Sequence, residues 1–244
     1  MKKIFIIGCL LLTSACNLPA STPVAEPTQT ATLPSSPDAD STPQTAASTE
    51  TLTPTPAPPA LYFTEEFDTP SSYWEFLQTG GATAMITTIE NGSLRIDASS
   101  PDTWFVGIHT AHSYSDVFIR AKTAISQGGS VGLICRYSTD GWYEFNAASD
   151  GTYSILLGQL LSPGVAKYIP IINESSKQLT GSTSHELGLF CEGGFLQLFV
   201  NGTIIRRVDV TNYGLTEGKV GITASSFMEV PMSAIFEWVA VDKE

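Results

Sequence analysis

The residues with the most chemical potential gather near the middle of the chain, in SVGLICRYSTDGWYEFNAASDGTYSILL, which spans residues 130–157. Arg136 offers a rigid planar fork of hydrogen-bond donors, while Glu144 and Asn146 can accept hydrogen bonds from hydroxyl groups. Sugars are typically held by such planar polar groups together with aromatic side chains in a groove. The aromatic residues that could complete a ligand-binding surface of this kind are Trp104, Trp142 and Tyr143.

The face of the strand that each residue occupies decides whether it can reach a ligand. Alternation along a strand puts Glu144 and Asn146 on one face and Tyr143 on the other, which resembles core. Whether Arg136 shares the face of Glu144 depends on the loop Ser138–Gly141, because one bulge residue would reverse its direction. The alternative is that Arg136 pairs with Glu144 or another carboxylate and only holds the sheet together.

Paired carboxylates, the groups that hydrolyse glycosidic bonds, do not occur at a suitable local spacing. Such pairs lie across one cleft, about 5.5 Å or about 6.5–9.5 Å apart. Glu66 and Asp68 stand at the start of the folded region, and Ser71 occupies the position where a third acid would follow. Glu144 has no acidic residue two positions away on either side. We therefore predict no catalytic residues, with a hydrolase whose acids come from separate strands as the alternative.

The histidines give only a weak metal signal. His109 and His112 form an H-x-x-H pair, and His185 stands alone. Neither a nearby cysteine nor an H-E-x-x-H helix accompanies the pair, so exposed or loop-packed histidines are favoured over metal ligands.

Cys135 and Cys191 are the cysteines outside the amino-terminal segment. In a protein outside the cytoplasm, an even pair of cysteines indicates a disulfide. Each lies within a strand-like run, where neighbouring strands bring Cα atoms close enough for a bond. Two buried free thiols are the alternative. Neither cysteine is predicted to be catalytic, because no histidine stands nearby in the sequence to activate a thiolate.

The first residues, MKKIFIIGCLLLTSAC, have the pattern of a secretory signal: two lysines, a short apolar run, and small residues before Cys16. The ending LTSAC resembles a bacterial lipobox, in which the chain is cut before the cysteine and its thiol is acylated. Two or more acyl chains would hold the protein firmly on a membrane. We therefore expect a signal peptide over residues 1–15 and a lipoprotein anchored at Cys16 to the bacterial cell membrane, facing outside the cytoplasm. A secretory signal cut elsewhere is the alternative.

Residues 16–60 are expected to form a disordered linker. Asn17–Ala60 holds ten of the chain's 15 prolines and contains no aromatic residue, glycine, lysine or arginine. Such a segment cannot bury enough apolar surface to fold. Aromatic residues begin at Leu61–Phe63, and residues 61–244 are long enough for one domain with a single core. We expect this domain to be monomeric.

The charge of the chain excludes one class of partner. There are 12 basic and 24 acidic residues, a net charge of −12, and loss of residues 1–15 would remove two lysines and leave −14. Nucleic acids and anionic membrane surfaces attract basic patches. We therefore expect no nucleic-acid partner, and membrane contact through the lipid anchor only.

The folded region has the pattern of an all-β protein. Short runs rich in Val, Ile, Phe, Tyr and Thr alternate with Gly, Asn, Asp and Ser. Asn91-Gly92, Asp150-Gly151 and Asn201-Gly202 each predict a two-residue type I′ hairpin turn, in which both central residues take positive φ. About a dozen strands result, which are too many for a seven-stranded immunoglobulin sandwich and suit a two-sheet antiparallel jelly roll. Around the central stretch, strands are expected at Tyr143–Ser149, Thr152–Leu157 and Lys167–Ile172.

The order of several segments resembles the concanavalin A-like jelly rolls of lectins and glucanases. FTEEFDTPSSYW opens the domain, SVGLICRYSTDGWYEF leads into an aromatic hairpin, ELGLFCEGGFLQLFVNGTII supplies a late hairpin, and FEWVAVDKE closes it. More narrowly, the chain is similar to the laminin-G-like and 3-keto-disaccharide-hydrolase-like domains of bacterial lipoproteins. The resemblance covers nearly all of residues 61–244 and implies that the opening strand pairs near the closing one. It says little about function, because this fold hosts lectins, glycanases, adhesion modules and spacers.

The resemblance also implies a calcium site near the joined termini, where Glu66, Asp68 and Asp242 would supply oxygen ligands. No other cofactor is expected. Our leading hypothesis is a non-catalytic module that binds a glycan or another cell-surface ligand on the concave sheet. A carbohydrate hydrolase and a purely structural or adhesion domain are the alternatives.

Overall fold

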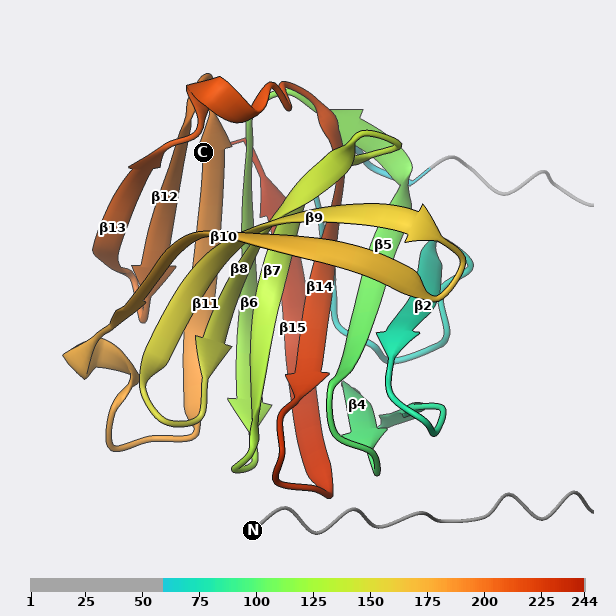
Figure 1. Ribbon diagram of the computed structural model, residues 1–244. Coiled ribbons are helices and arrows are strands. Elements are labelled where there is room, and N and C mark those ends of the chain that lie inside the picture. The colour runs from blue at the N-terminus through green and yellow to red at the C-terminus, as the bar shows by residue number, and fades with distance from the viewer. Residues whose placement is uncertain (1–58, 244) are drawn as a thin grey trace, which may run out of the picture. The chain divides into compact units, whose positions relative to one another are not determined.

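The computed structural model describes residues 59–243, which form two antiparallel β-sheets packed face to face (Figure 1). The predicted signal peptide, Cys16 and nearly all of the predicted linker lie outside the described residues. Within residues 59–243, no helix is long and apolar enough to cross a membrane. The two-sheet all-β sandwich predicted from the sequence is confirmed.

The first sheet, sheet A, comprises β1 (Phe63–Glu65), β3 (Ile86–Glu90), β4 (Ser93–Ala98), β6 (Val117–Ile125), β11 (Ser184–Glu192), β12 (Phe195–Val200), β13 (Thr203–Asp209) and β15 (Met232–Asp242). Its order is β13-β12-β11-β6-β15-β4-β3, with β1 also on β15. β1 pairs with residues 239–241 of β15, and β4 pairs with residues 232–236. The opening strand therefore pairs with the closing strand, as the resemblance implied.

The second sheet, sheet B, comprises β2 (Trp74–Gly80), β5 (Thr103–Tyr114), β7 (Gly129–Ser138), β8 (Gly141–Ala148), β9 (Thr152–Ser162), β10 (Val165–Ser175) and β14 (Gly218–Ser226). Its order is β10-β9-β8-β7-β14-β5-β2. Two short 3-10 turns, η1 (Lys177–Leu179) and η2 (Thr211–Tyr213), interrupt the connections.

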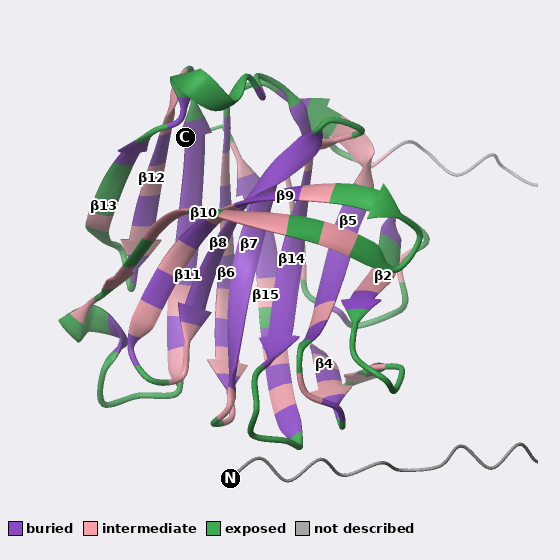
Figure 2. Cartoon of the chain, viewed as in Figure 1, coloured by how far each residue is buried: buried purple, intermediate pink, exposed green. Residues whose placement is uncertain are grey.

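Alternating burial places the core between the sheets (Figure 2). In β6 of sheet A, Val117, Ile119 and Ala121 are buried while the residues between them are half-exposed. In β7 and β8 of sheet B, almost every residue is buried. Something other than sheet A must therefore cover the outer face of these central strands.

Two of the three predicted type I′ turns are confirmed. Both residues of Asn91-Gly92 and of Asn201-Gly202 have positive φ, between 50° and 75°. The turn at Asp150 is a hairpin turn of a different type, because only Gly151 has positive φ, at 87°. The Gly151 amide donates to the Ala148 carbonyl oxygen at 3.1 Å, which makes a three-residue loop ending in a left-handed glycine.

No strand was predicted at β2, and the two strands of the β9–β10 hairpin are longer than predicted. β9 continues to Ser162 and β10 begins at Val165, whereas the predicted strands ended at Leu157 and began at Lys167. Pro163 and Gly164 form the tip, and Pro170 lies within β10, which is an edge strand and tolerates a residue without an amide proton.

The predicted disulfide is confirmed between Cys135 and Cys191, with Cα atoms 6.7 Å apart. It joins β7 to β11 and therefore ties sheet B to sheet A, rather than joining neighbours within one sheet.

Candidate ligand-binding site

The β9–β10 hairpin bends over the outer face of sheet B (Figure 1). β9 pairs with β8 as far as Gly158, which is opposite Trp142, and both hairpin strands then continue across the face. At the far edge, the Gly80 amide of β2 donates to the Gly164 carbonyl oxygen at the hairpin tip, 3.4 Å away. The hairpin therefore spans the sheet from β8 to β2.

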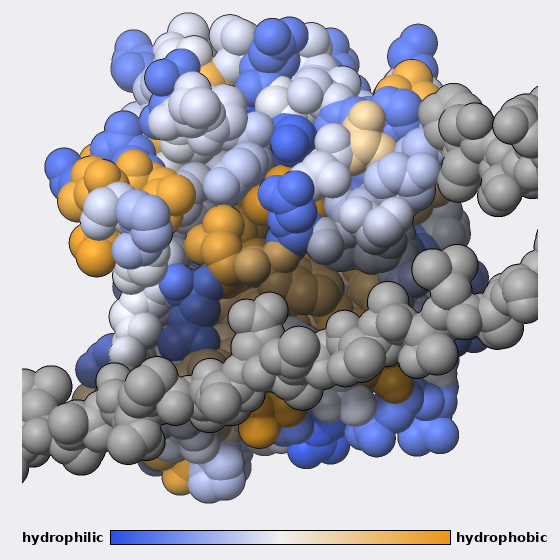
Figure 3. Space-filling view, turned by 90° about the vertical axis from the view of Figure 1, so that its right-hand side faces the viewer, coloured by the Kyte–Doolittle hydropathy of each residue, from blue (hydrophilic) through white to orange (hydrophobic). Residues whose placement is uncertain are grey.

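The hairpin tip is held by backbone contact rather than by burial of its side chains. Leu160, Leu161 and Val165 are all exposed, and apolar surface is visible on this side of the molecule in Figure 3.

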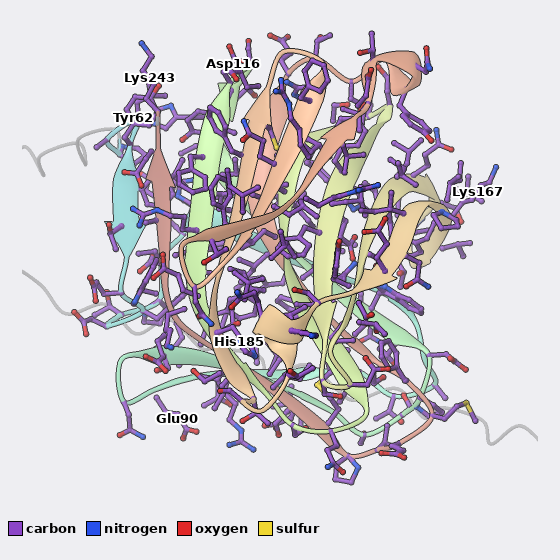
Figure 4. All side chains as sticks on the ribbon, turned by 90° about the vertical axis from the view of Figure 1, so that its left-hand side faces the viewer. Tyr62, Glu90, Asp116, Lys167, His185 and Lys243 are labelled. Atoms are coloured by element: carbon purple, nitrogen blue, oxygen red, sulfur yellow. A yellow bond between two sulfur atoms is a disulfide. The ribbon has the colours of Figure 1, made fainter. Side chains whose placement is uncertain are left out.

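Tyr168 of β10 fastens the hairpin to the sheet. Its ring stacks on Trp104, with centroids 5.1 Å apart, and meets Trp142 edge-on at 5.9 Å. Its hydroxyl lies 3.2 Å from that of Thr79. The preceding residue, Lys167, projects away from the domain in Figure 4, as alternation along the strand requires.

An apolar cluster fills the space beneath the hairpin. Trp142 packs there with Val106, Ile108 and Ile134, and none of the four is more than 1% exposed. Gly158 makes room for the indole, because a Cβ atom at this position would lie 2.2 Å from the Trp142 ring. Trp142, one of the candidate ligand-binding residues, therefore lies under the β9–β10 hairpin, where a ligand cannot stack on it.

Glu144 is fully buried beside Trp142. It accepts hydrogen bonds from Trp142 Nε1 at 2.8 Å, from Asn146 Nδ2 at 2.8 Å and from Thr223 Oγ1 at 3.0 Å. Burial raises the pKa of Glu144, and the three donors partly oppose that rise. The carboxylate thus orients its three neighbours from inside the protein.

Asn146 connects this network to a pocket. Its side chain is 5% exposed, and because Nδ2 donates to Glu144 the Oδ1 atom points elsewhere and has no partner. An unsatisfied buried acceptor costs about 1–3 kcal/mol. Asn146 lines a pocket of about 130 Å³, so a hydroxyl group of a ligand there could satisfy this oxygen.

The pocket lies between sheet B and the hairpin. Trp104, Tyr153 and Phe227 are the aromatic residues that line it, and none of its lining residues is charged. The strand register places Asn146 beside a serine of β9, which in turn lies beside an asparagine of β10. The polar residues that line the pocket with Asn146 include Ser130, Ser154, Asn173 and Ser225.

A second cavity, of about 380 Å³, adjoins the pocket at Phe227, which lines both. The turns after β6 and β8 and the loop after β14 form it, and they contribute Gln127, Asp150 and Met228. Phe227 and Met228 are 39% and 77% exposed. The pocket therefore opens towards the loops at this end of the sheets.

Glu75 shares a face with Glu144 but is too far away to act with it. It pairs with Ile108, a member of the cluster beneath the hairpin. Its strand, β2, is four strands from β8 in the sheet, which corresponds to about 19 Å at about 4.8 Å per strand. The acids of glycosidases lie about 5–9.5 Å apart, so these two glutamates do not form such a pair.

Arg136 occupies a β-bulge in β7. The register shifts between Cys135 and Ser138, and Arg136 has a φ of 55°. Its buried guanidinium donates to the carbonyl oxygens of Leu215 at 2.9 Å and Ser115 at 3.2 Å. The side chain therefore holds two loops at the end of the sandwich and does not meet Glu144.

Tyr143 faces the core, as predicted, and its hydroxyl donates to the Val210 carbonyl oxygen at 3.3 Å. The Arg136 guanidinium is 3.9 Å from Asp116, which lies at the end of the sandwich in Figure 4. Burial lowers the pKa of Arg136. Of the six candidate ligand-binding residues, the structure thus brings only Trp104 and Asn146 to the pocket.

The candidate metal ligands do not converge. No three or more His, Cys, Asp or Glu side chains in residues 59–243 form a group that could hold a metal ion. Asp242 instead forms an ion pair with Arg120 at 2.8 Å, and Glu66 and Asp68 are exposed. His109, expected to be exposed or loop-packed, is 3% exposed, and burial lowers its pKa to about 4.

Of the eleven residues that line the pocket, the sequence analysis named only Trp104 and Asn146 as candidates. Alternation would have found Ser154, because Tyr153 and Ile155 on either side of it face the core. Asn173 lies one residue beyond the strand that was predicted, and Phe227 lies in a loop whose position no pattern specifies. Ser225 could have been placed by the same alternation within β14.

Comparison with solved structures defines the class of fold. The chain resembles the β-glucanase of Bacillus licheniformis, with a TM-score of 0.51 and 13% identity over 75% of this chain and 98% of that one. A β-1,3-1,4-glucanase from a mouse hindgut metagenome gives 0.53 and 12%, over 75% and 99%. The laminarinase catalytic domain of Thermotoga maritima gives 0.52 and 12%, over 75% and 97%.

At these identities the likeness defines the fold alone. Residues 59–243 form a jelly roll of the β-glucanase type, with a hairpin across its outer sheet face. The sequence matches no protein-family model, and no curated protein matches it in sequence.

Proposed function

We propose that this domain is a non-catalytic module that binds a carbohydrate in the pocket beside the β9–β10 hairpin. One observation carries the proposal: Asn146 Oδ1 is buried, has no hydrogen-bond partner and belongs to a side chain that lines the pocket. A sugar hydroxyl is a donor of suitable size for this oxygen.

The other pocket residues support the same ligand class. Trp104 is half-buried and stacks on Tyr168 through one face, while Asn173 and Ser154 add uncharged polar groups. Aromatic walls with a few convergent polar groups suit a sugar ring. Solved structures with the same fold include a β-glucanase and a laminarinase, which adds support for a carbohydrate ligand.

Binding without hydrolysis is favoured by the position of the acids. Glu144 makes three internal hydrogen bonds behind the pocket wall, and Glu75 is too distant to serve as its partner. Glu144 and Glu75 therefore do not form the pair of carboxylates that flanks a scissile glycosidic bond.

The experiment is a glycan screen of the purified protein against mixed-linkage β-glucan, β-1,3-glucan and mucin. We expect at least one to be retained by the wild type, and retention to fall about tenfold or more in Asn146→Ala and Trp104→Ala. Gln197→Ala, on the outer face of sheet A, is the matched control and should bind as the wild type does. Release of reducing sugar, or equal binding by all variants, would overturn the proposal.

We also propose that the protein is a lipoprotein held on the outer side of a bacterial membrane through Cys16. The support is the LTSAC sequence that ends the apolar amino-terminal run. Labelled palmitate should enter the wild-type protein in cells and not the Cys16→Ser variant. Equal labelling of both, or labelling of neither, would refute the anchor.

A further inference from the structure

We infer that the pocket accepts the terminal unit of a neutral glycan chain and does not accept the interior of a chain. This inference rests on the proposed function and defines the ligand more narrowly. It follows from the walls that surround the pocket, the size of the space and the absence of charge.

The hairpin closes one side of the pocket. Tyr168 stacks on Trp104 and its hydroxyl meets that of Thr79. The Gly164 carbonyl oxygen accepts a hydrogen bond from the Gly80 amide at the far edge of sheet B. Contacts therefore continue along the hairpin from β8 to β2 and leave no open groove between the hairpin tip and the sheet.

A glycan chain cannot pass beneath the hairpin either. Trp142, Val106, Ile108 and Ile134 occupy that space and are at most 1% exposed. A polysaccharide that bound through its interior would have to leave the pocket on two sides, and one of these sides is solid protein.

The remaining direction is open. The larger cavity adjoins the pocket at Phe227 and continues past Met228, both of which are exposed. A chain whose last unit sits beside Asn146 would run out across these two side chains, at the end of sheet B where the loops lie. The geometry therefore fits a chain that enters from its end.

The size and chemistry of the pocket set the unit that fits. A volume of about 130 Å³ is well below the about 300 Å³ at the small end of drug-sized ligand pockets, which suits a single small ring. No charged side chain lines the pocket, so a carboxylate or sulfate on that ring would be desolvated without a counter-charge. The terminal unit is therefore uncharged.

The orientation of Asn146 defines one contact. Nδ2 is committed to Glu144 at 2.8 Å, and the Oδ1 atom is left to accept. The group of the terminal unit that meets it must therefore be a donor, such as a free hydroxyl.

The test asks whether the amount of bound protein follows the number of glycan chain ends or the mass of glycan. Mixed-linkage β-glucan, β-1,3-glucan and mucin are immobilised at equal mass, intact or after limited acid hydrolysis to about a tenth of the original chain length. The number of ends per mass then rises about tenfold, and for a glycan that the wild type retains, the amount of bound protein should rise by about the same factor.

The outcomes separate the two proposals. Retention that follows mass and ignores the number of ends overturns the inference and leaves the carbohydrate-binding function standing. Retention of none of the intact or hydrolysed glycans overturns both.

A second variant tests the hairpin itself. Leu157 and Ile169 are cross-strand partners, so replacing residues 158–168 by Asn-Gly joins them through a two-residue turn and removes the barrier. This variant should bind intact polymer about as well as hydrolysed polymer. If the folded variant still binds hydrolysed polymer better than intact polymer, the hairpin is not the barrier. If the variant fails to fold, the comparison of intact and hydrolysed glycans with the wild type decides the inference.

Discussion

At the scale of single residues, the proposed recognition of a glycan depends on which way the side-chain amide of Asn146 points. Asn146 presents its oxygen to the pocket because its Nδ2 donates a hydrogen bond to the buried carboxylate of Glu144. Trp142 and Thr223 also donate to that carboxylate, so its ionised form has its partners in place. Protonation of Glu144 would remove the negative charge that strengthens the hydrogen bond from Asn146 Nδ2 and so weaken the contact that turns the amide oxygen towards the pocket.

Ligand binding should therefore weaken in acid. The pKa of Glu144 is raised by burial, so protonation begins at a higher pH than for an exposed glutamate. Affinity for the retained glycan should fall as the pH is lowered from neutral into the acidic range, because protonation of Glu144 weakens the contact that orients Asn146. Isothermal titration calorimetry across this range measures the effect.

Glu144→Gln reproduces the uncharged state at every pH. We expect its affinity at neutral pH to be about tenfold lower, about 1.4 kcal/mol, with little further change in acid. Thr223→Val removes a different donor to Glu144 and leaves Asn146 in place, so it should retain the pH dependence. An unchanged affinity in Glu144→Gln would refute this role.

His109 is a second buried group with a consequence for pH. Its ring lies 4.2 Å from Phe63 and 5.3 Å from Trp74 between centroids, and burial lowers its pKa to about 4. The unfolded chain, with an ordinary pKa of about 6.5, binds a proton that the folded chain rejects. The free energy of unfolding should therefore fall by about 3 kcal/mol between about pH 7 and pH 4 on this account.

His109→Phe should remove this loss. Phenylalanine suits the aromatic surroundings, and the Nδ1 atom that it replaces has no partner. Urea unfolding at both pH values isolates the effect as a difference between wild type and variant, because Glu144, whose pKa is raised, acts with the opposite sign in both proteins. The same acid-dependent loss in both would contradict the assignment.

The sequence predicted which face of the sheet each candidate residue occupies better than how deeply that residue is buried. Alternation correctly separated Asn146 from Tyr143, and Trp104, a predicted candidate, lines the pocket. The burial of Glu144 and Trp142 could not be predicted, because it depends on a hairpin that folds back from a later part of the chain. For Arg136, the bulge that decides its direction is set by loop geometry rather than by residue pattern.

At the scale of elements, the β9–β10 hairpin determines what the outer face of sheet B can do. Its course depends on close packing of Trp142 against backbone at Gly158, where a Cβ atom would lie 2.2 Å from the ring. Because Gly158 has no side chain, the Trp142 indole can lie directly against the backbone of β9. The hairpin and the cluster beneath it therefore form one packed layer.

Gly158→Ala should disrupt this layer. The methyl group must displace the indole, and we expect a loss of about 1–3 kcal/mol in the free energy of unfolding. Ser154→Ala is the control, because Ser154 lies four residues earlier on the same face of β9. This substitution should lower the free energy of unfolding by less than about 1 kcal/mol. Urea denaturation gives both values, and equal stability of Gly158→Ala and wild type would show that the hairpin is not packed as described.

The elements of the two sheets were largely predictable, and the covering hairpin was not. Alternation and the Asn-Gly turns gave most of the strands of both sheets, because each strand has one apolar face. β10 lacks that alternation, since its residues are mostly half-exposed or exposed and Pro170 interrupts it. Its length follows from pairing with β9 and from tertiary contacts with β2, neither of which leaves a local pattern.

At the scale of the whole molecule, an acidic chain carries an uncharged pocket. The net charge is −12, whereas the pocket is lined by aromatic, amide and hydroxyl groups. A strongly acidic ligand would be repelled by the protein as a whole, and a neutral glycan would not. The Cys135–Cys191 bond fixes the two sheets to each other.

The most direct test of the binding site is nuclear magnetic resonance of the ¹⁵N-labelled protein during titration with the retained glycan. We predict that the side-chain amide of Asn146 and the indole of Trp104 shift together and saturate at the same ligand concentration. The amide of Gln197 and the indole of Trp238, both on sheet A, should stay unchanged. Shifts confined to sheet A, with Asn146 and Trp104 unmoved, would contradict the account.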